Sequence, residues 1–175
     1  MDRATGLPDT DTERTPPSNE SLPVQTGLPD AARKSLAEGL ARVLADTYTL
    51  LGKTHGFHWN VTGPHFHSLH EMFQDQYEDL TEAVDDLAER IRALGHFSPG
   101  SLSQFLKLTD VEDEHGVPDA IAMVGQLVRD NELITRACRQ VVDTAQEAGD
   151  TVTEDLMNQR MAYHEKAAWM LRASL

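Results

Sequence analysis

The sequence predicts an all-α protein built around a bundle of four long helices. Apolar residues recur at helical spacing over four long stretches, and Gly or Pro interrupts the pattern between them. No stretch shows the alternating pattern that is typical of a strand. With 175 residues, the chain is long enough to bury the core of one such domain.

Each expected helix is bounded by start and stop signals. We expect helices over about 30–60, 68–94, 118–148 and 151–175. A Pro-Asp pair opens the first and a Gly-Pro pair ends it, capping-box spacings open the second and fourth, and a proline suits the first turn of the third. These signals are Pro29-Asp30, Gly63-Pro64, Ser68 with Glu71, Pro118, Gly149, and Thr151 with Glu154.

A linker from Gly95 to Val117 separates the second helix from the third, and its central run SLSQFLKL is long enough for a short helix. Four long helices with a crossover linker at this place favour a ferritin-like four-helix bundle. We therefore expect a ferritin-like domain at residues 30–175 with a short helix in the crossover linker.

Residues 1–29 are expected to form an acidic tail before this domain. They hold five of the eight prolines among Thr, Ser, Asp and Glu, with little apolar periodicity. Such a segment cannot recover its ordering entropy by burial, so we expect it to be disordered. Residues 1–30 contain two Arg and six Asp or Glu, which gives that stretch a net charge of −4.

Composition also limits where the protein works. No apolar run reaches the ~18 residues of a membrane helix, and the start MDRATG lacks the basic and apolar regions of a secretory signal. We expect a cytoplasmic protein with no membrane partner. The single Cys138 lies in an apolar helical pattern, which favours a buried hydrophobic role over redox chemistry.

Residues 55–89 gather side chains that bind hard or borderline metals. Asp85 and Glu89 are four residues apart, so their carboxylates share one helix face and can hold one ion or two adjacent ions. On a helical wheel His70 and Gln74 also lie away from the apolar stripe of the second helix. Five of the eight histidines fall within the first sixteen residues of this segment, at His55, His58, His65, His67 and His70.

His70 cannot join these carboxylates within one chain. Fifteen residues at about 1.5 Å each put it roughly 22 Å from Asp85, whereas a metal needs its donors within about 2.0–2.6 Å. Two copies of the second helix, packed antiparallel about a two-fold axis, would bring them together and create two identical sites. The predicted metal site therefore joins His58 and His70 of one subunit with Asp85 and Glu89 of its mate.

Other interpretations of these residues stay open. Outward carboxylates are usually solvated surface, and a His near a helix end is more often a cap than a ligand. Trp59, with Phe57, Phe66 and Phe73 nearby, suggests a buried stretch, which an ordinary dimer interface would also explain. A zinc site without turnover is a further alternative, because His and carboxylate ligands suit Zn²⁺ as well as iron.

A metal site inside one bundle is not expected. Di-iron sites of ferritin-like bundles use Glu-x-x-His pairs that project into the core. The only such spacing here, Glu112 to His115, falls in the linker before Pro118. This absence favours the site between subunits.

The run KTHGFHWNVTGPHFHSLHEMF, followed by VDDLAERIRALG, resembles the Dps proteins, mini-ferritins named as DNA-binding proteins from starved cells. The resemblance extends from about Val24 to the C-terminus. In that family two histidines twelve apart, with an Asp and a Glu four apart further along, form an inter-subunit ferroxidase centre. These positions match His58, His70, Asp85 and Glu89, whereas Gln74 stands where many relatives have a carboxylate, which weakens the expected second iron site.

The resemblance implies a ferroxidase. Fe²⁺ would be oxidised by hydrogen peroxide, or by O₂, and stored as a Fe³⁺ mineral inside a hollow dodecamer, which protects against oxidative damage. The alternative is a nucleoid protein that coats DNA. The net charge of −14, the acidic tail and a C-terminus with only Arg172 charged argue against it, because DNA affinity comes largely from Lys and Arg.

The resemblance also implies an iron entry pore. Asp150, Glu154 and Asp155 cluster around the turn after Gly149, where carboxylates commonly interact with the dipole of the following helix. The family's acidic three-fold pores are lined by carboxylates in this region of the chain. We therefore expect these three residues to be candidate pore residues, which would concentrate Fe²⁺.

Overall fold

The computed structural model describes residues 24–175, so most of the expected tail, residues 1–29, lies outside the described residues. Within the described range every element is a helix, which confirms the all-α class. None of these helices is long and apolar enough to cross a membrane. The elements are α1 (Asp30–Asn60), α2 (Phe66–Ala93), α3 (Leu102–Leu108), α4 (Ala120–Ala148) and α5 (Thr151–Arg172).

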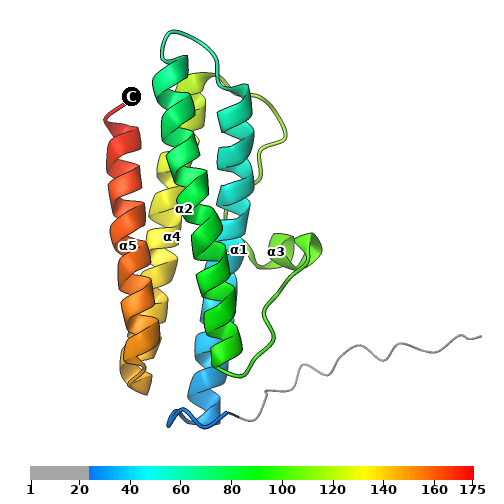
Figure 1. The fold of residues 1–175 in the computed structure, drawn as a ribbon, viewed down its shortest axis with the longest axis vertical. Coiled ribbons are helices and arrows are strands. Elements are labelled where there is room, and N and C mark those ends of the chain that lie inside the picture. The colour runs from blue at the N-terminus through cyan, green and yellow to red at the C-terminus, as the bar shows by residue number, and fades with distance from the viewer. Residues whose placement is uncertain (1–23) are drawn as a thin grey trace, which may run out of the picture.

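Four of the helices lie side by side in one bundle, and short α3 lies against the outside of α1 (Figure 1). α1 and α2 form one antiparallel hairpin, and α4 and α5 form the other (Figure 1). The crossover linker carries the chain back along the bundle, so α4 starts at the same end as α2 (Figure 1). The short linker helix expected from SLSQFLKL is therefore confirmed.

The core is the apolar interior between the four helices. The predicted stripe of α2 is buried, with Phe73, Leu80 and Leu87 at most 1 % exposed. Cys138 is fully buried and free, and burial raises the pKa of its thiol to about 12 although the charge of Arg160 opposes this. The predicted hydrophobic role of Cys138 is thus supported.

Two polar side chains hold the linker and the helix ends in place. Arg33, near the start of α1, donates to the backbone carbonyl of Leu94 at the end of α2 at 2.8 Å. Asp46, 1 % exposed in mid-α1, accepts from Thr109 Oγ1 at 2.9 Å and from the backbone N–H of Asp110 at 2.7 Å. The chain just after α3 is therefore fixed to the middle of α1.

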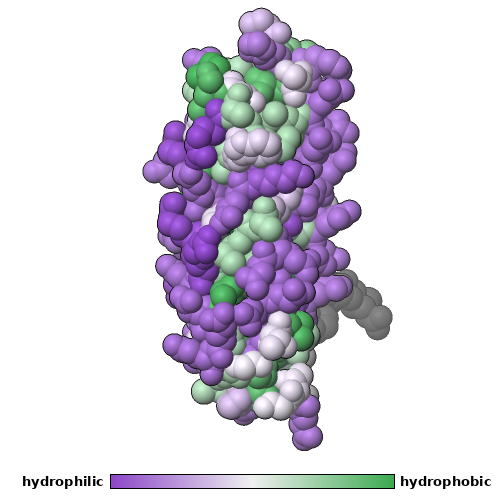
Figure 2. Space-filling model, turned by 90° about the vertical axis from the view of Figure 1, so that its left-hand side faces the viewer, coloured by the Kyte–Doolittle hydropathy of each residue, from purple (hydrophilic) through white to green (hydrophobic). Residues whose placement is uncertain are grey.

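Polar contacts join α2 to α5. Arg160 of α5 pairs with Asp79 of α2 at 2.8 Å, and Tyr163 Oη donates to the carbonyl of Gln76. Figure 2 shows the face that carries α5, where apolar side chains gather near the two ends and a narrower apolar strip lies between polar side chains in the middle. Exposed Val152 near the start of α5 and exposed Trp169 near its end agree with that pattern.

The helix starts differ from the prediction in three places. α2 begins at Phe66, so Ser68 lies inside the helix, where its Oγ donates to the carbonyl of His65, and it forms no capping box with Glu71. Asp150 caps α5 in place of Thr151 by accepting from the backbone N–H of Thr153. Pro118 lies just before the cap of α4, which is Asp119.

Candidate metal centre

His58 and His70 lie face to face where α1 meets α2. His58 is in the last turn of α1 and His70 in the second turn of α2, and the turn between the helices includes Gly63 with a φ of +111°, which only Gly adopts readily. The two imidazole rings stack with centroids 3.8 Å apart and planes inclined by 18°. The sequence prediction that these two histidines can lie together in one chain agrees with this geometry.

The backbone selects the tautomer of both neutral rings. His58 Nδ1 lies 2.9 Å from the carbonyl oxygen of His70, and His70 Nδ1 lies 2.8 Å from the carbonyl oxygen of His58. A carbonyl oxygen only accepts, so each neutral ring must carry its proton on Nδ1. Each Nε2 then keeps a lone pair, which is the form that binds a metal.

Aromatic rings surround this pair. Phe66 stacks on His70 with centroids 5.1 Å apart, and Tyr77 meets the edge of His58 at 5.1 Å. Tyr77 also stacks on His55. The ring centroids of His55 and Trp59 lie 4.3 Å apart. Phe57 and Phe73 are buried, but Trp59 is 66 % exposed in the single chain. An exposed Trp at this place suits a surface that another subunit covers.

Asp85 and Glu89 lie on the other half of α2, exposed and one turn apart. Within residues 24–175 neither carboxylate has a hydrogen bond or ion pair. In the same range no three His, Cys, Asp or Glu side chains of one chain come close enough to hold a metal. His58 and His70 therefore offer two nitrogen donors, and no third His, Cys, Asp or Glu of the same chain joins them within this range.

Gln74 lies one turn beyond His70 on α2 and is half-buried. Its Nε2 donates to Glu78 Oε1 at 2.7 Å. Of the remaining histidines in the segment, His65 and His67 are exposed, and His67 faces Glu71 at 3.4 Å.

Comparison with known proteins places this chain in a family. A ferritin-like domain model matches residues 37–175. The chain is 36 % identical over 148 residues to the DNA protection during starvation protein of Porphyromonas gingivalis. The aligned region covers 85 % of this chain and 93 % of the relative. The chain belongs to the Dps family of ferritin-like proteins. The family resemblance and the ferritin-like fold class predicted from the sequence are thereby confirmed.

Two further comparisons cover a similar share of the chain. A low-temperature-induced protein of Nostoc sp. is 43 % identical over 152 residues, which is 86 % of this chain and 85 % of that protein. The crystal structure of the Dps protein of Vibrio cholerae superposes with a TM-score of 0.83 at 30 % identity, covering 88 % of this chain and 98 % of the other. That structure is described as a member of a broad superfamily of ferritin-like diiron-carboxylate proteins.

The three candidate pore residues have different surroundings. Asp150 is 4 % exposed, and both of its carboxylate oxygens accept from Arg90, at 2.8 and 2.7 Å. Burial alone would raise the pKa of Asp150, but hydrogen bonds from Thr153 and Arg90 outweigh it and leave that pKa below its usual value. Asp150 is therefore a helix cap and ion-pair partner in the bundle, and its carboxylate does not face open solvent.

Glu154 and Asp155 remain available for a pore. Glu154 is half-buried and accepts from Gln146, whereas Asp155 is exposed and accepts from Gln159 within α5. Asp155 also lines a groove of about 430 Å³ between α2 and α5, to which Glu89 belongs. The entry pore formed by Asp150, Glu154 and Asp155 stays a prediction, and the structure shows that Asp150 is the most buried of the three.

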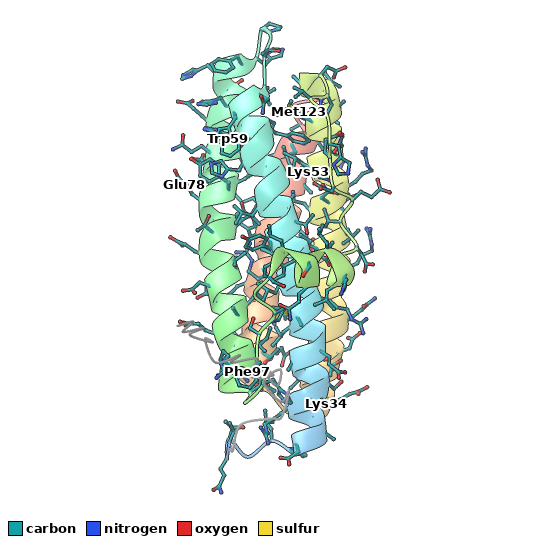
Figure 3. The ribbon with its side chains drawn as sticks, turned by 90° about the vertical axis from the view of Figure 1, so that its right-hand side faces the viewer. Lys34, Lys53, Trp59, Glu78, Phe97 and Met123 are labelled. Atoms are coloured by element: carbon teal, nitrogen blue, oxygen red, sulfur yellow. The ribbon has the colours of Figure 1, made fainter. Side chains whose placement is uncertain are left out.

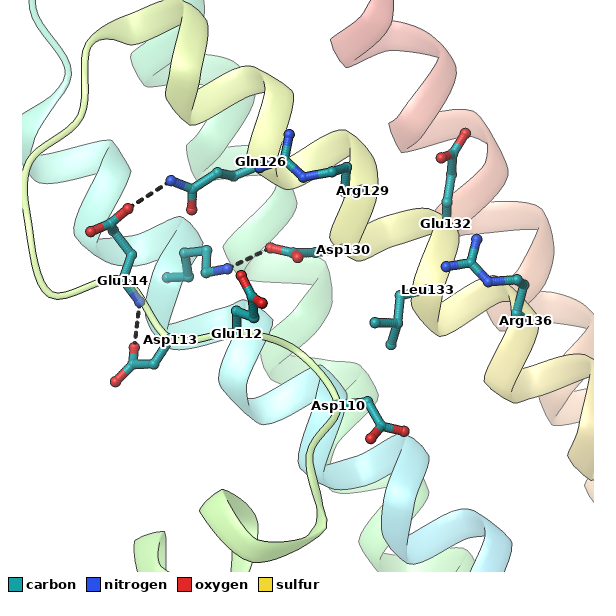
Figure 4. A pocket seen from close by; sticks show the side chains of 11 residues that line it. Asp110, Glu112, Asp113, Glu114, Gln126, Arg129, Asp130, Glu132, Leu133 and Arg136 are labelled. Carbon is teal, nitrogen blue, oxygen red and sulfur yellow. Dashed lines mark hydrogen bonds and ion pairs between the residues drawn. The ribbon is translucent and has the colours of Figure 1, made fainter.

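A second polar region, which the sequence did not indicate as a unit, lies between the crossover linker and α4 (Figure 4). In this pocket of about 420 Å³, buried Lys53 of α1 donates to Asp130 of α4 at 2.8 Å. Burial raises the pKa of Asp130, and Lys53 partly opposes that rise. Glu114 of the linker accepts from Gln126 of α4 at 2.7 Å. These contacts hold the linker, including Glu112 and His115, outside the core.

Proposed function

We propose that this Dps-family protein is an iron-storage mini-ferritin that oxidises Fe²⁺ at centres shared between subunits and keeps the Fe³⁺ as a mineral inside a hollow oligomer. The observation that carries the proposal is the reciprocal hydrogen bonding of His58 and His70, which leaves two Nε2 lone pairs free for a metal. Asp85 and Glu89 of the partner subunit would complete each centre.

The donor set suits a change in iron oxidation state. Imidazole nitrogen binds Fe²⁺ well, whereas carboxylate oxygen increasingly favours the harder Fe³⁺. The two carboxylates also neutralise the charge that rises as each ion loses an electron. His58 and His70 need no rearrangement on binding, because backbone carbonyls already fix both rings.

Hydrogen peroxide is the oxidant that we propose, with O₂ as the alternative. Two Fe²⁺ ions each give one electron, the O–O bond of the peroxide breaks, and both oxygens end as oxide or hydroxide bound to Fe³⁺. Hydrolysis of the Fe³⁺ then releases protons to water. This route consumes peroxide together with the Fe²⁺ that would convert it to radicals, and so protects the cell.

Exposed apolar side chains support an oligomer. Trp59 and Phe66 flank the histidine pair, and large apolar side chains are also exposed on α3, at the start of α4 and on α5. Single exposed apolar side chains are common on globular proteins, so the support comes from Trp59 and Phe66, which flank the histidine pair. We propose a dodecamer with tetrahedral symmetry, and the residues concerned are Trp59, Phe66, Leu102, Leu106, Ile121, Val152 and Trp169.

Anaerobic loading with Fe²⁺, followed by separate additions of O₂ and peroxide, tests the function. We expect peroxide to oxidise the iron quickly, O₂ to act more slowly, and His58→Ala or Asp85→Ala to abolish the fast phase. Light scattering should show a closed oligomer. A stable monomer, or oxidation that does not depend on His58, would overturn the proposal. Zn²⁺ that binds and blocks oxidation would be a competitor, whereas Zn²⁺ binding without any Fe²⁺ oxidation would favour a structural zinc site.

A further inference from the structure

A layer of polar side chains crosses the apolar centre of the bundle. On each long helix, buried residues recur at steps of three and four, which is the spacing of positions that face the bundle interior. Most of these positions are apolar, but at one level each of the four helices carries a polar residue there. These residues are Thr54 of α1, Gln76 of α2, Asn131 of α4 and His164 of α5, and none is more than 7 % exposed.

Contacts between helices place three of these residues at the same level. Lys53, which precedes Thr54, lies between α1 and α4 (Figure 3) and pairs with Asp130 at 2.8 Å. Asp130 in turn precedes Asn131, so Thr54 and Asn131 are level with each other. Asn131 Oδ1 lies 2.8 Å from His164 Nδ1, which brings α5 to this level as well.

Tyr163 and Arg160 extend the α5 side of the layer. The hydroxyl of Tyr163 donates to the backbone carbonyl of Gln76, which joins α2 to the same level. The guanidinium of Arg160 lies 4.5 Å over the Tyr163 ring, and its Nη1 is 2.8 Å from Asp79 Oδ1. Burial is the main cause of the lowered pKa of His164, and the charge of Arg160 is the second. The guanidinium and the imidazole are therefore close to each other in the interior.

Several polar atoms of this layer have no hydrogen-bond partner within residues 24–175. They are Thr54 Oγ1, His164 Nε2, and both Nε and Nη2 of Arg160. Thr54 and His164 are fully buried, and Arg160 is only 8 % exposed. Because an unpaired buried polar atom is costly, nearly all such atoms in proteins bond to other protein atoms or to ordered water.

The unpaired atoms need different partners. Asn131 Nδ2 donates to the carbonyl of Leu127, so Oδ1 is the amide atom that faces His164, and it must accept. His164 Nδ1 therefore carries the ring proton, and Nε2 of the neutral ring needs a donor. Arg160 has only donors and needs an acceptor, whereas the hydroxyl of Thr54 can do both. A water molecule donates twice and accepts twice, so it satisfies all three side chains.

The same atoms do not suit an ion. The positive charge of Arg160 repels a cation, and within the described part of the chain no three His, Cys, Asp or Glu side chains gather around a common point. An anion would face the lone pair of His164 Nε2. The layer therefore favours a small neutral ligand that both donates and accepts.

From these observations we propose that the centre of the bundle is a binding site for internal water, held between α1 and α5. The water donates to His164 Nε2 and bonds to Thr54 Oγ1, while the free nitrogens of Arg160 donate to it or to a second water molecule beside it. α1 packs against α2 and α4, and α5 packs against the same two helices, so α1 and α5 lie diagonally across the bundle. The water joins this diagonal pair at a level where side chains alone leave polar atoms unpaired.

A crystal structure of the metal-free, full-length oligomer, at a resolution that shows ordered water, tests the proposal directly. We expect a water molecule in every subunit at about 2.7–3.2 Å from both His164 Nε2 and Thr54 Oγ1. Internal waters of this kind typically make about three hydrogen bonds. A structure without ordered water within reach of these two atoms would overturn the proposal.

Thr54→Val tests it a second time, through the sign of a stability change. Valine keeps the shape of threonine but has no hydroxyl. If Thr54 bonds to water, the variant loses that hydrogen bond, and its melting temperature should fall by about 2–4 °C. If the hydroxyl is instead buried without a partner, its removal should raise the melting temperature.

Thr47→Val is the matched control. Thr47 is fully buried at an equivalent position of α1, but its Oγ1 donates to the carbonyl of Val43 in its own helix, at 2.7 Å. We expect this variant to change the melting temperature by less than Thr54→Val does. A Thr54→Val protein that is as stable as wild type, or more stable, would overturn the proposal. If that variant does not assemble, the wild-type crystal structure decides alone.

Discussion

His58 and His70 each donate a ring N–H to the backbone carbonyl of the other, although twelve residues and a turn separate them. The two hydrogen bonds tie the last turn of α1 to the start of α2 and orient both rings. One half of the proposed metal centre is therefore ordered within a single chain. The proposed other half, Asp85 and Glu89, lies roughly four to five helical turns from His70 on the same α2, so a second subunit would have to supply it.

Mixing two inactive variants should restore activity if the centre is shared. Neither His58→Ala nor Asp85→Ala should oxidise Fe²⁺ alone. In co-refolded oligomers, an interface between one chain of each kind has one centre with both substitutions and one centre with neither. We expect partial recovery, at most about half of the wild-type rate per mixed interface. If refolded wild type regained activity but the mixture did not, the centre would not be shared between subunits.

The sequence predicts most of this fold because helical periodicity and Gly or Pro breaks are local signals. The ends of α1 at Asp30 and Asn60 agree with the prediction, since a Pro precedes the helix and Gly63-Pro64 follows it. The caps are harder to predict from the sequence, because a capping side chain can also make contacts outside its own helix. The cap of α5 depends on Arg90, sixty residues away, which pairs with Asp150 and draws it into the bundle.

The site also combines local features, which the sequence predicts, with contacts between helices, which it does not. Spacing along α2 reveals that His70, Asp85 and Glu89 share a helix but cannot meet, and that Gln74 and Glu78 are one turn apart. Spacing does not reveal that the amide nitrogen of Gln74 donates to the carboxylate of Glu78. The contact of Tyr77 with His55 and His58 also needed the structure, because it depends on how α2 packs against α1.

Acid should weaken the fold through His164. This side chain is fully buried, and its Nδ1 donates to Asn131 Oδ1 at 2.8 Å, while Asn131 Nδ2 donates to the carbonyl of Leu127. Burial, with a smaller effect of the Arg160 charge, lowers the pKa of His164 to about 3. The unfolded chain takes up a proton near pH 6.5. Stability should therefore fall as the pH drops from about 6.5 toward 3, by at most ~1.4 kcal/mol per subunit for each pH unit.

Thermal melts of the metal-free protein at pH 7.5 and pH 5 would measure this effect. His164→Gln keeps a donor for Asn131 but cannot be protonated, so its melting temperature should change less between the two pH values. Other titrating groups, such as Asp46 and Asp130, are the same in both proteins and cancel in the comparison. Equal pH dependence in the two proteins would exclude His164 as the cause.

Replacing Glu154 and Asp155 by Gln and Asn should slow iron uptake several-fold and leave the oligomer intact. Carboxylate rings concentrate Fe²⁺ through their field, so the effect should be larger at low than at high ionic strength. Asp150→Asn should behave differently, because it breaks a buried ion pair with Arg90 and should lower the melting temperature. Stopped-flow uptake at two salt concentrations measures the first effect. If the double variant took up iron as fast as wild type at low salt, Glu154 and Asp155 would have no role in iron entry. Their role would then be confined to interactions at the start of α5.

Direct binding to duplex DNA should be weak or absent at about 0.15 M salt. The chain carries 29 Asp and Glu against 15 Lys and Arg, and its first thirty residues are acidic as well. Phosphate contacts require clustered Lys and Arg, yet the basic groups Arg33, Arg90 and Arg160 each pair with a carboxylate of their own chain. Gel shifts with and without Mg²⁺, and with the tail deleted, would measure the binding. Deletion of residues 1–23 should not create a tight complex, because the remaining chain is still acidic. A tight complex of the full-length protein without divalent cations would contradict the charge argument and favour a DNA-coating role.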